Sequence, residues 1–238
     1  MSNPDHTNRP DTLKQVVMEL KFPPNLRITR NICDFAEGLG DDHFYEPLAT
    51  KNPFSPINTP GYRFAHRGGY LELHLFEDSL AIQVPRYPGF SNFRSKAIHL
   101  ISLASEHFGL EAFDRLGLLY KNVFYFLPER DIYPICQHLF PHLNFEHPDV
   151  QKQRRFSLSL EADRPEGGIN IRSSFHSDKF TDGELAGTDF GVYLLDLDAF
   201  HDASFTKARL ETIFDGLHDE IKNTYNLHVM RTLKGQEY

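Results

Sequence analysis

Two carboxylates stand two residues apart in an apolar run near the end of the chain. Asp196 and Asp198 alternate with apolar residues, so on a β-strand both would project from the same face. Paired carboxylates on a strand can hold Mg²⁺ in enzymes that transfer phosphoryl groups. The sequence has no glycine-rich phosphate loop and no third carboxylate at a clear spacing. The alternative is a solvated strand face on which the two aspartates pair with Arg155 or Arg172.

The thirteen histidines and two cysteines offer the other candidates for metal or nucleophilic chemistry. His176 stands near Asp178 and Asp182 in a segment that we expect to be a polar loop, and this spacing matches no tetrahedral zinc site. Cys33 and Cys136 each fall within a helical apolar pattern, which favours small buried thiols in a reducing compartment. We therefore expect no metal, no cofactor and no catalytic residue.

A wider set of polar residues is predicted to share one face of a sheet. The expected strands alternate apolar and polar residues, so the polar ones should lie opposite the helices. The residues on which we expect a ligand or partner to bind are Glu72, His74, Arg155, Asn170, Arg172, Asp196 and Asp198. Arginine suits this role because its planar fork binds carboxylate or phosphate through two hydrogen bonds. The alternative is an ordinary solvated sheet face.

The elements that would position these residues occur twice in the same order. The first half predicts a strand, a helix, a proline-rich loop, three strands and a helix, at 15–22, 28–39, 41–61, 62–66, 70–76, 80–84 and 91–108. The second half predicts a strand, a short helix, three strands and a long helix, at 115–126, 132–140, 155–161, 168–174, 191–198 and 204–225. The shared order indicates a duplicated β-α-β-β-β-α module.

This duplication predicts an α+β fold with a mostly antiparallel, curved sheet and helices on one face. We expect a flexible tail at 1–14, a first module at 15–112 and a second at 113–238, packed as one globular unit. The architecture resembles the TATA-binding-protein-like and helix-grip folds, a likeness that carries no function by itself.

Composition narrows the possible partners. The formal net charge of −8 disfavours binding to nucleic acid and to anionic membranes. No apolar run approaches the roughly 20 residues that a membrane-spanning helix needs, and the first residues lack the apolar stretch of a secretion signal. We expect a cytoplasmic protein with no membrane contact.

Four motifs, in this order, resemble a known family. They are the segment 16–23, Arg86-Tyr87 followed by Phe90 and Phe93, the segment 115–118 followed by Tyr120 and Asn122, and Leu217-His218. Together they resemble a sporadically distributed prokaryotic family that is known only by a serial number. Phe90 stands where many of its members carry tryptophan. The family has no established activity, so the resemblance implies no catalytic residue, and its patchy distribution is typical of mobile defence, toxin–antitoxin or accessory genes.

The leading hypothesis is a non-enzymatic recognition or regulatory protein that binds a protein or a small polar ligand on the polar sheet face. An adaptor, an antitoxin-like or immunity-like neutraliser and a sensor subunit would all fit. The alternative is a metal-dependent enzyme that acts on nucleotides or phosphoesters through Asp196 and Asp198. His218, beside the apolar stripe of the last helix, is expected to make one hydrogen bond across a half-buried interface.

Overall fold

The computed structural model describes residues 13–40, 43–48, 61–126, 155–179 and 189–227. For residues 44–48, 126, 155–156, 177–179 and 189–190 the description covers the backbone alone. The short helix expected at 132–140, Cys136 and Asp182 lie outside the described residues.

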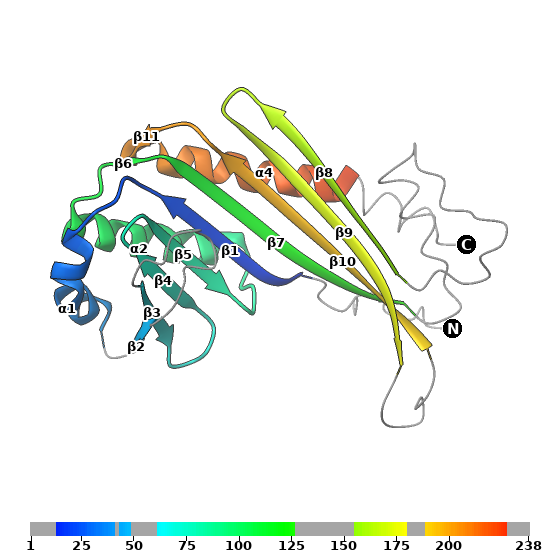
Figure 1. Ribbon diagram of the computed structural model, residues 1–238, viewed down its shortest axis with the longest axis horizontal. Coiled ribbons are helices and arrows are strands. Elements are labelled where there is room, and N and C mark those ends of the chain that lie inside the picture. The colour runs from blue at the N-terminus through cyan, green and yellow to red at the C-terminus, as the bar shows by residue number, and fades with distance from the viewer. Residues whose placement is uncertain (1–12, 41–42, 49–60, 127–154, 180–188, 228–238) are drawn as a thin grey trace, which may run out of the picture.

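One antiparallel sheet of nine strands forms the frame of the described chain (Figure 1). The strands follow the spatial order β2-β3-β4-β5-β1-β7-β10-β9-β8. Their bounds are β1 Leu13–Lys21, β2 His43–Leu48, β3 Gly61–His66, β4 Glu72–Phe76, β5 Ser79–Val84, β7 Arg115–Phe126, β8 Arg155–Arg164, β9 Gly167–Lys179 and β10 Asp189–His201. A small separate pair joins β6 (Ala112–Phe113) to β11 (Phe205–Thr206).

Both halves of the chain build outward from the central β1–β7 pair in the same way. One side follows β1-β5-β4-β3 and the other follows β7-β10-β9-β8. Within the nine-stranded sheet, the first strand from each half therefore pairs with the last strand from the same half, and a long helix follows later in the sequence. The edge strand β2 extends the first side by one more strand.

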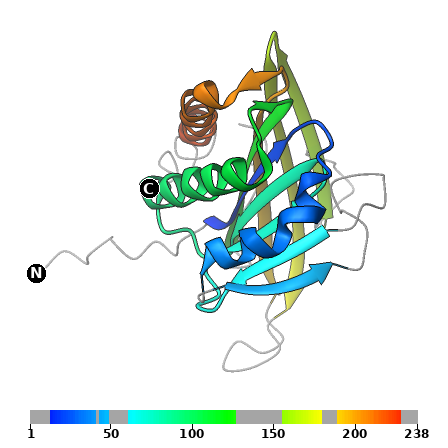
Figure 2. The ribbon, with the colours of Figure 1, turned by 90° about the vertical axis from the view of Figure 1, so that its left-hand side faces the viewer.

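In the described parts of the chain, three helices cover one side of the sheet, and Figure 2 shows them on that side. They are α1 (Arg27–Leu39), α2 (Phe90–Phe108) and α4 (Leu210–Tyr225), the last preceded by a 3₁₀ turn at Lys207–Arg209. Helix α4 lies against β7 and β10, and α1 packs on α2. We call the opposite side of the sheet the outer face. Among the described helices, none is long and apolar enough to cross a membrane.

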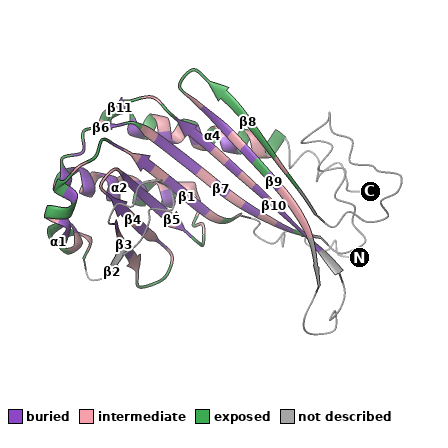
Figure 3. Ribbon diagram, viewed as in Figure 1, coloured by how far each residue is buried: buried purple, intermediate pink, exposed green. Residues whose placement is uncertain are grey.

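The core lies between the sheet and these helices (Figure 3). The predicted alternation is confirmed in β4 and just before it, where Leu71, Leu73 and Leu75 are all buried. Phe93 of α2 and Phe214 of α4 are fully buried and meet edge to face, with ring centroids 5.8 Å apart. This contact joins the two long helices over the middle of the sheet.

Three expectations about local structure were wrong. The proline-rich loop contains β2, which tolerates Pro47 because an edge strand needs hydrogen bonds on one side only. His176 and Asp178 lie on β9 and not in a loop, because β9 continues to Lys179. Cys33 is exposed, because the buried stripe of α1 runs through Ile28, Ile32 and Phe35 and passes beside it.

Candidate functional site

Four of the predicted binding residues form one patch on the outer face. Asp196 lies opposite Arg172 and Asp198 opposite Asn170 in the β10–β9 pairing, and directly opposed residues project from the same face. Asp198 accepts a hydrogen bond from the Asn170 side chain, and its Oδ2 lies 4.0 Å from Arg172 Nη2. The Arg172 side chain is 56% exposed. The patch therefore presents one accessible cation above two partly covered carboxylates.

Burial decides the protonation behaviour of these two aspartates. Loss of solvent raises the pKa of Asp196 above its ordinary value, and the charges of Lys121 and Arg172 offset this only in part. Burial likewise raises the pKa of Asp198, opposed by the hydrogen bond from Asn170 and by nearby arginines. Both carboxylates are therefore easier to protonate than exposed ones.

Glu72 and His74 share the outer face but belong to a second, separate patch on β4. Arg63 donates to both carboxylate oxygens of Glu72, at 2.6 and 3.2 Å, and this bonding lowers the pKa of Glu72. His74 Nε2 lies 3.3 Å from the same carboxylate. From β4 to β10 there are four strand spacings, or roughly 19 Å. The sheet register thus places both patches on one face without bringing them together.

Arg155 and Arg172 lie on adjacent strands but do not lie side by side. Arg155 is opposite His176, whereas Arg172 is opposite Ser159. The four-residue offset corresponds to roughly 13 Å along the strands. The register thus places the two arginines on adjacent strands, with Arg155 at one end of the β8–β9 pairing and Arg172 near its middle.

The described residues contain no group of three or more His, Cys, Asp or Glu placed to hold a metal ion. The charged neighbours of Asp196 are Lys121, Arg172 and Asp198. Those of Asp198 include Arg115, Arg172 and the carboxylate of Glu19.

On the helix side, sequence reasoning missed a cavity between α4 and the sheet. It has a volume of about 260 Å³ and is partly open. Its walls are mostly apolar and include Leu13, Leu197, Ile221 and Tyr225. The residues come from β1, β10 and α4, so no single stretch of sequence carries the signal.

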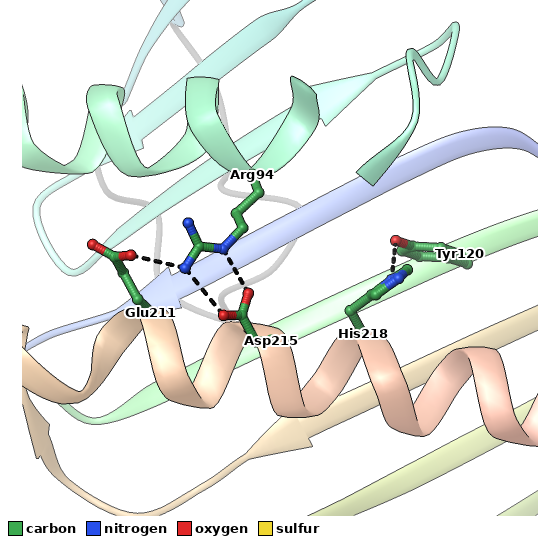
Figure 4. Close-up of polar contacts among 5 residues, drawn as sticks. All are labelled: Arg94, Tyr120, Glu211, Asp215 and His218. Atoms are coloured by element: carbon green, nitrogen blue, oxygen red, sulfur yellow. Dashed lines mark hydrogen bonds and ion pairs between the residues drawn. The ribbon is translucent and has the colours of Figure 1, made fainter. Parts of the chain in front are cut away.

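A hydrogen-bonded chain of three side chains borders this cavity. Tyr120 on β7 is 7% exposed, and its hydroxyl lies 2.8 Å from the Tyr87 hydroxyl and 2.8 Å from His218 Nδ1. Figure 4 shows His218 reaching from α4 to Tyr120. We call Tyr87, Tyr120 and His218 the Tyr–Tyr–His chain. The single hydrogen bond predicted for His218 is thus present in the structure, with Tyr120 as its partner.

The surroundings of the Tyr–Tyr–His chain favour the uncharged form of each of its three side chains. Burial raises the pKa of Tyr120 and of Tyr87, and burial lowers the pKa of His218. The Phe90 ring stacks on the His218 imidazole, with centroids 3.6 Å apart and planes 5° from parallel. All three groups are therefore neutral near pH 7.

The helix that carries His218 is fixed to α2 by an ion-pair cluster (Figure 4). Arg94 Nε and Nη2 donate to the two oxygens of Asp215 at 2.6 and 3.0 Å, and Nη2 also donates to Glu211 at 2.8 Å. Asp215 stands one turn before His218 on α4. The ion-pair cluster therefore helps to fix the position of α4 relative to the sheet, and with it the position of His218 beside Tyr120.

Several residues of the resembling motifs meet at the Tyr–Tyr–His chain. Tyr87, Phe90, Tyr120 and His218 are distant in sequence and adjacent in space. Asn122 lines the same cavity and donates to the Leu195 carbonyl at 3.2 Å. The full amino-acid sequence matches no protein-family model and no curated protein sequence. The protein's membership of the serially numbered prokaryotic family therefore stays a prediction.

Proposed function

We propose that this chain is a non-enzymatic recognition protein that binds a protein partner on its outer face. The observation that carries the proposal is the exposed Arg172, set among Asn170, Asp196 and Asp198 on a side of the sheet that none of the described helices covers. Arginine is enriched among the residues that dominate binding at protein interfaces.

The spread of the polar patches favours a protein over a small polar ligand. The β4 patch and the β9–β10 patch are roughly 19 Å apart, whereas sites for small molecules are concave and their polar groups converge. A protein partner covers on the order of 800 Å² on each side. Such a partner reaches both patches at once.

Arg172 is suited to contact a carboxylate of that partner. Its 4.0 Å approach to Asp198 is too long for a hydrogen bond, and an exposed pair of this kind contributes about 1 kcal/mol or less to folding. The guanidinium therefore stays available for a two-bond contact with a partner. An adaptor, an antitoxin-like or immunity-like neutraliser and a sensor subunit of a mobile defence locus would each act in this way in the cytoplasm.

We also propose that the sheet arose by duplication of a β-α-β-β-β-α module, in an architecture like the TATA-binding-protein-like or helix-grip folds. The matching strand orders on either side of the β1–β7 pair support this. The alternative function is a metal-dependent enzyme that acts on nucleotides or phosphoesters through Asp196 and Asp198. Measuring Tm with and without EDTA tests this alternative.

The test is a pull-down with identification of captured proteins by mass spectrometry, followed by titration of the purified partner. Arg172→Ala should weaken binding at least tenfold, about 1.4 kcal/mol, and leave Tm nearly unchanged. Arg209→Ala is the matched control, because Arg209 is 55% exposed and also lies near one carboxylate, 3.5 Å from Glu166. A partner that binds both variants like the wild type would overturn the assignment of this surface.

A further inference from the structure

The cavity beside the Tyr–Tyr–His chain is a partly open hollow of about 260 Å³. Typical small-molecule sites have volumes of about 300–1,000 Å³, mostly apolar walls and a few placed polar groups. The cavity has such walls and lies just below this range, so its size suits a small ligand.

The Tyr–Tyr–His chain has one hydrogen-bond donor that its internal bonds do not use. Three neutral groups carry three polar hydrogens, and the two internal hydrogen bonds use two of them. If Tyr120 donates to His218 Nδ1, the remaining hydrogen is on Nε2. If Nδ1 donates to Tyr120, the remaining hydrogen is on the Tyr87 hydroxyl, or on the Tyr120 hydroxyl when Tyr87 also donates to Tyr120. In each arrangement a ligand with an oxygen acceptor can accept the hydrogen that is left, since all three side chains line the cavity.

A positive charge stands one helical turn beyond His218. Lys222 lines the cavity and is exposed, and the described residues give its ammonium no ion-pair partner. His218 and Lys222 are four residues apart on α4, so they project from the same side of the helix, with Cβ atoms about 6 Å apart. One carboxylate can therefore reach both side chains.

We propose that the cavity binds a small apolar carboxylate. The apolar body of the ligand lies against Leu13, Leu197 and Ile221, and its carboxylate accepts a hydrogen bond from the Tyr–Tyr–His chain and pairs with Lys222. This site is on the helix side of the sheet. It is separate from the outer face and does not depend on the function proposed for that face.

The test compares acids with alcohols of the same carbon skeleton. Octanoate and 4-phenylbutyrate, with 1-octanol and 4-phenylbutanol as neutral counterparts, are titrated into the full chain and followed by NMR. We expect each acid to bind at least tenfold more tightly than its alcohol, with NOEs from ligand protons to the rings of Tyr120 and Tyr225. Lys222→Ala should remove the preference for the acid. Lys207→Ala, at a half-buried lysine in the 3₁₀ turn before α4, should keep it.

A second variant tests the place of binding. Ile221→Phe puts a larger side chain into the cavity and should weaken acid and alcohol alike by at least tenfold. The proposal is overturned if neither acid binds, if the alcohols bind as well as the acids, or if the NOEs fall on residues away from the cavity. If Ile221→Phe does not fold, the NOEs and the Lys222→Ala comparison still decide.

Discussion

Replacing Tyr120 by Phe should be the most informative single change at the Tyr–Tyr–His chain. The ring is 7% exposed and its packing is retained, so only the hydroxyl and its two 2.8 Å hydrogen bonds are lost. Each such bond contributes about 0.5–1.5 kcal/mol net. The partners Tyr87 and His218 are half-buried, and water replaces part of what they lose. We expect the free energy of unfolding to fall by about 1–2.5 kcal/mol.

The variant Tyr87→Phe provides the comparison for Tyr120→Phe. Tyr87→Phe removes one of the two hydrogen bonds and should cost about 0.5–1.5 kcal/mol. The double variant should cost hardly more than Tyr120→Phe alone, because the bond between the two hydroxyls is already absent. Equilibrium urea unfolding followed by far-UV circular dichroism measures all three variants, a suitable probe since the chain has no tryptophan. Fully additive costs, or a cost below about 0.5 kcal/mol for Tyr120→Phe, would refute the hydrogen-bonded chain.

Three further predictions concern the core, the outer face and metal dependence. Phe214→Ala should cost about 3–5 kcal/mol in urea unfolding, because its ring is fully buried against Phe90 and Phe93. Burial raises the folded-state pKa of Asp196 above 3.8, so its contribution to stability grows as the pH falls through that raised pKa. Asp196→Asn should therefore raise Tm at pH 7, and the gain should shrink on acidification to about pH 4. Chelation with EDTA should leave Tm unchanged; a fall of several degrees, reversed by one divalent ion, would instead favour the metal-dependent enzyme.

The alternation of apolar residues made most of the sheet predictable from the sequence. Strands such as 115–126 carry a clear period of two, and the structure has β7 at those residues. Strand β2 was missed because proline-rich composition predicts a loop, and only pairing with β3 makes an edge strand of it. The strand predicted at 168–174 ended too early, because His176 and Asp178 interrupt the apolar pattern near the C-terminal end of β9.

The candidate sites were harder to predict from the sequence than the sheet. Which residues share the outer face follows from alternation, but their distances depend on strand order, and this order puts Glu72 and Asp196 four strands apart. The three residues of the Tyr–Tyr–His chain come from a loop, a strand and a helix. No local spacing in the sequence predicts that they meet. Its one signal was His218 beside the apolar stripe, from which a hydrogen bond could be predicted but not its partner.

The central position of β1 has a consequence for how the chain folds during synthesis. β1 pairs with β5 on one edge and with β7 on the other, and both partners follow it in the sequence, β7 only from Arg115. Until β7 leaves the ribosome, one edge of β1 is open, and an open edge can pair with other chains. The pairing also closes long loops, which slows folding. A nascent first half can therefore pair with other chains along β1, and β7 covers this edge of β1 once it is made.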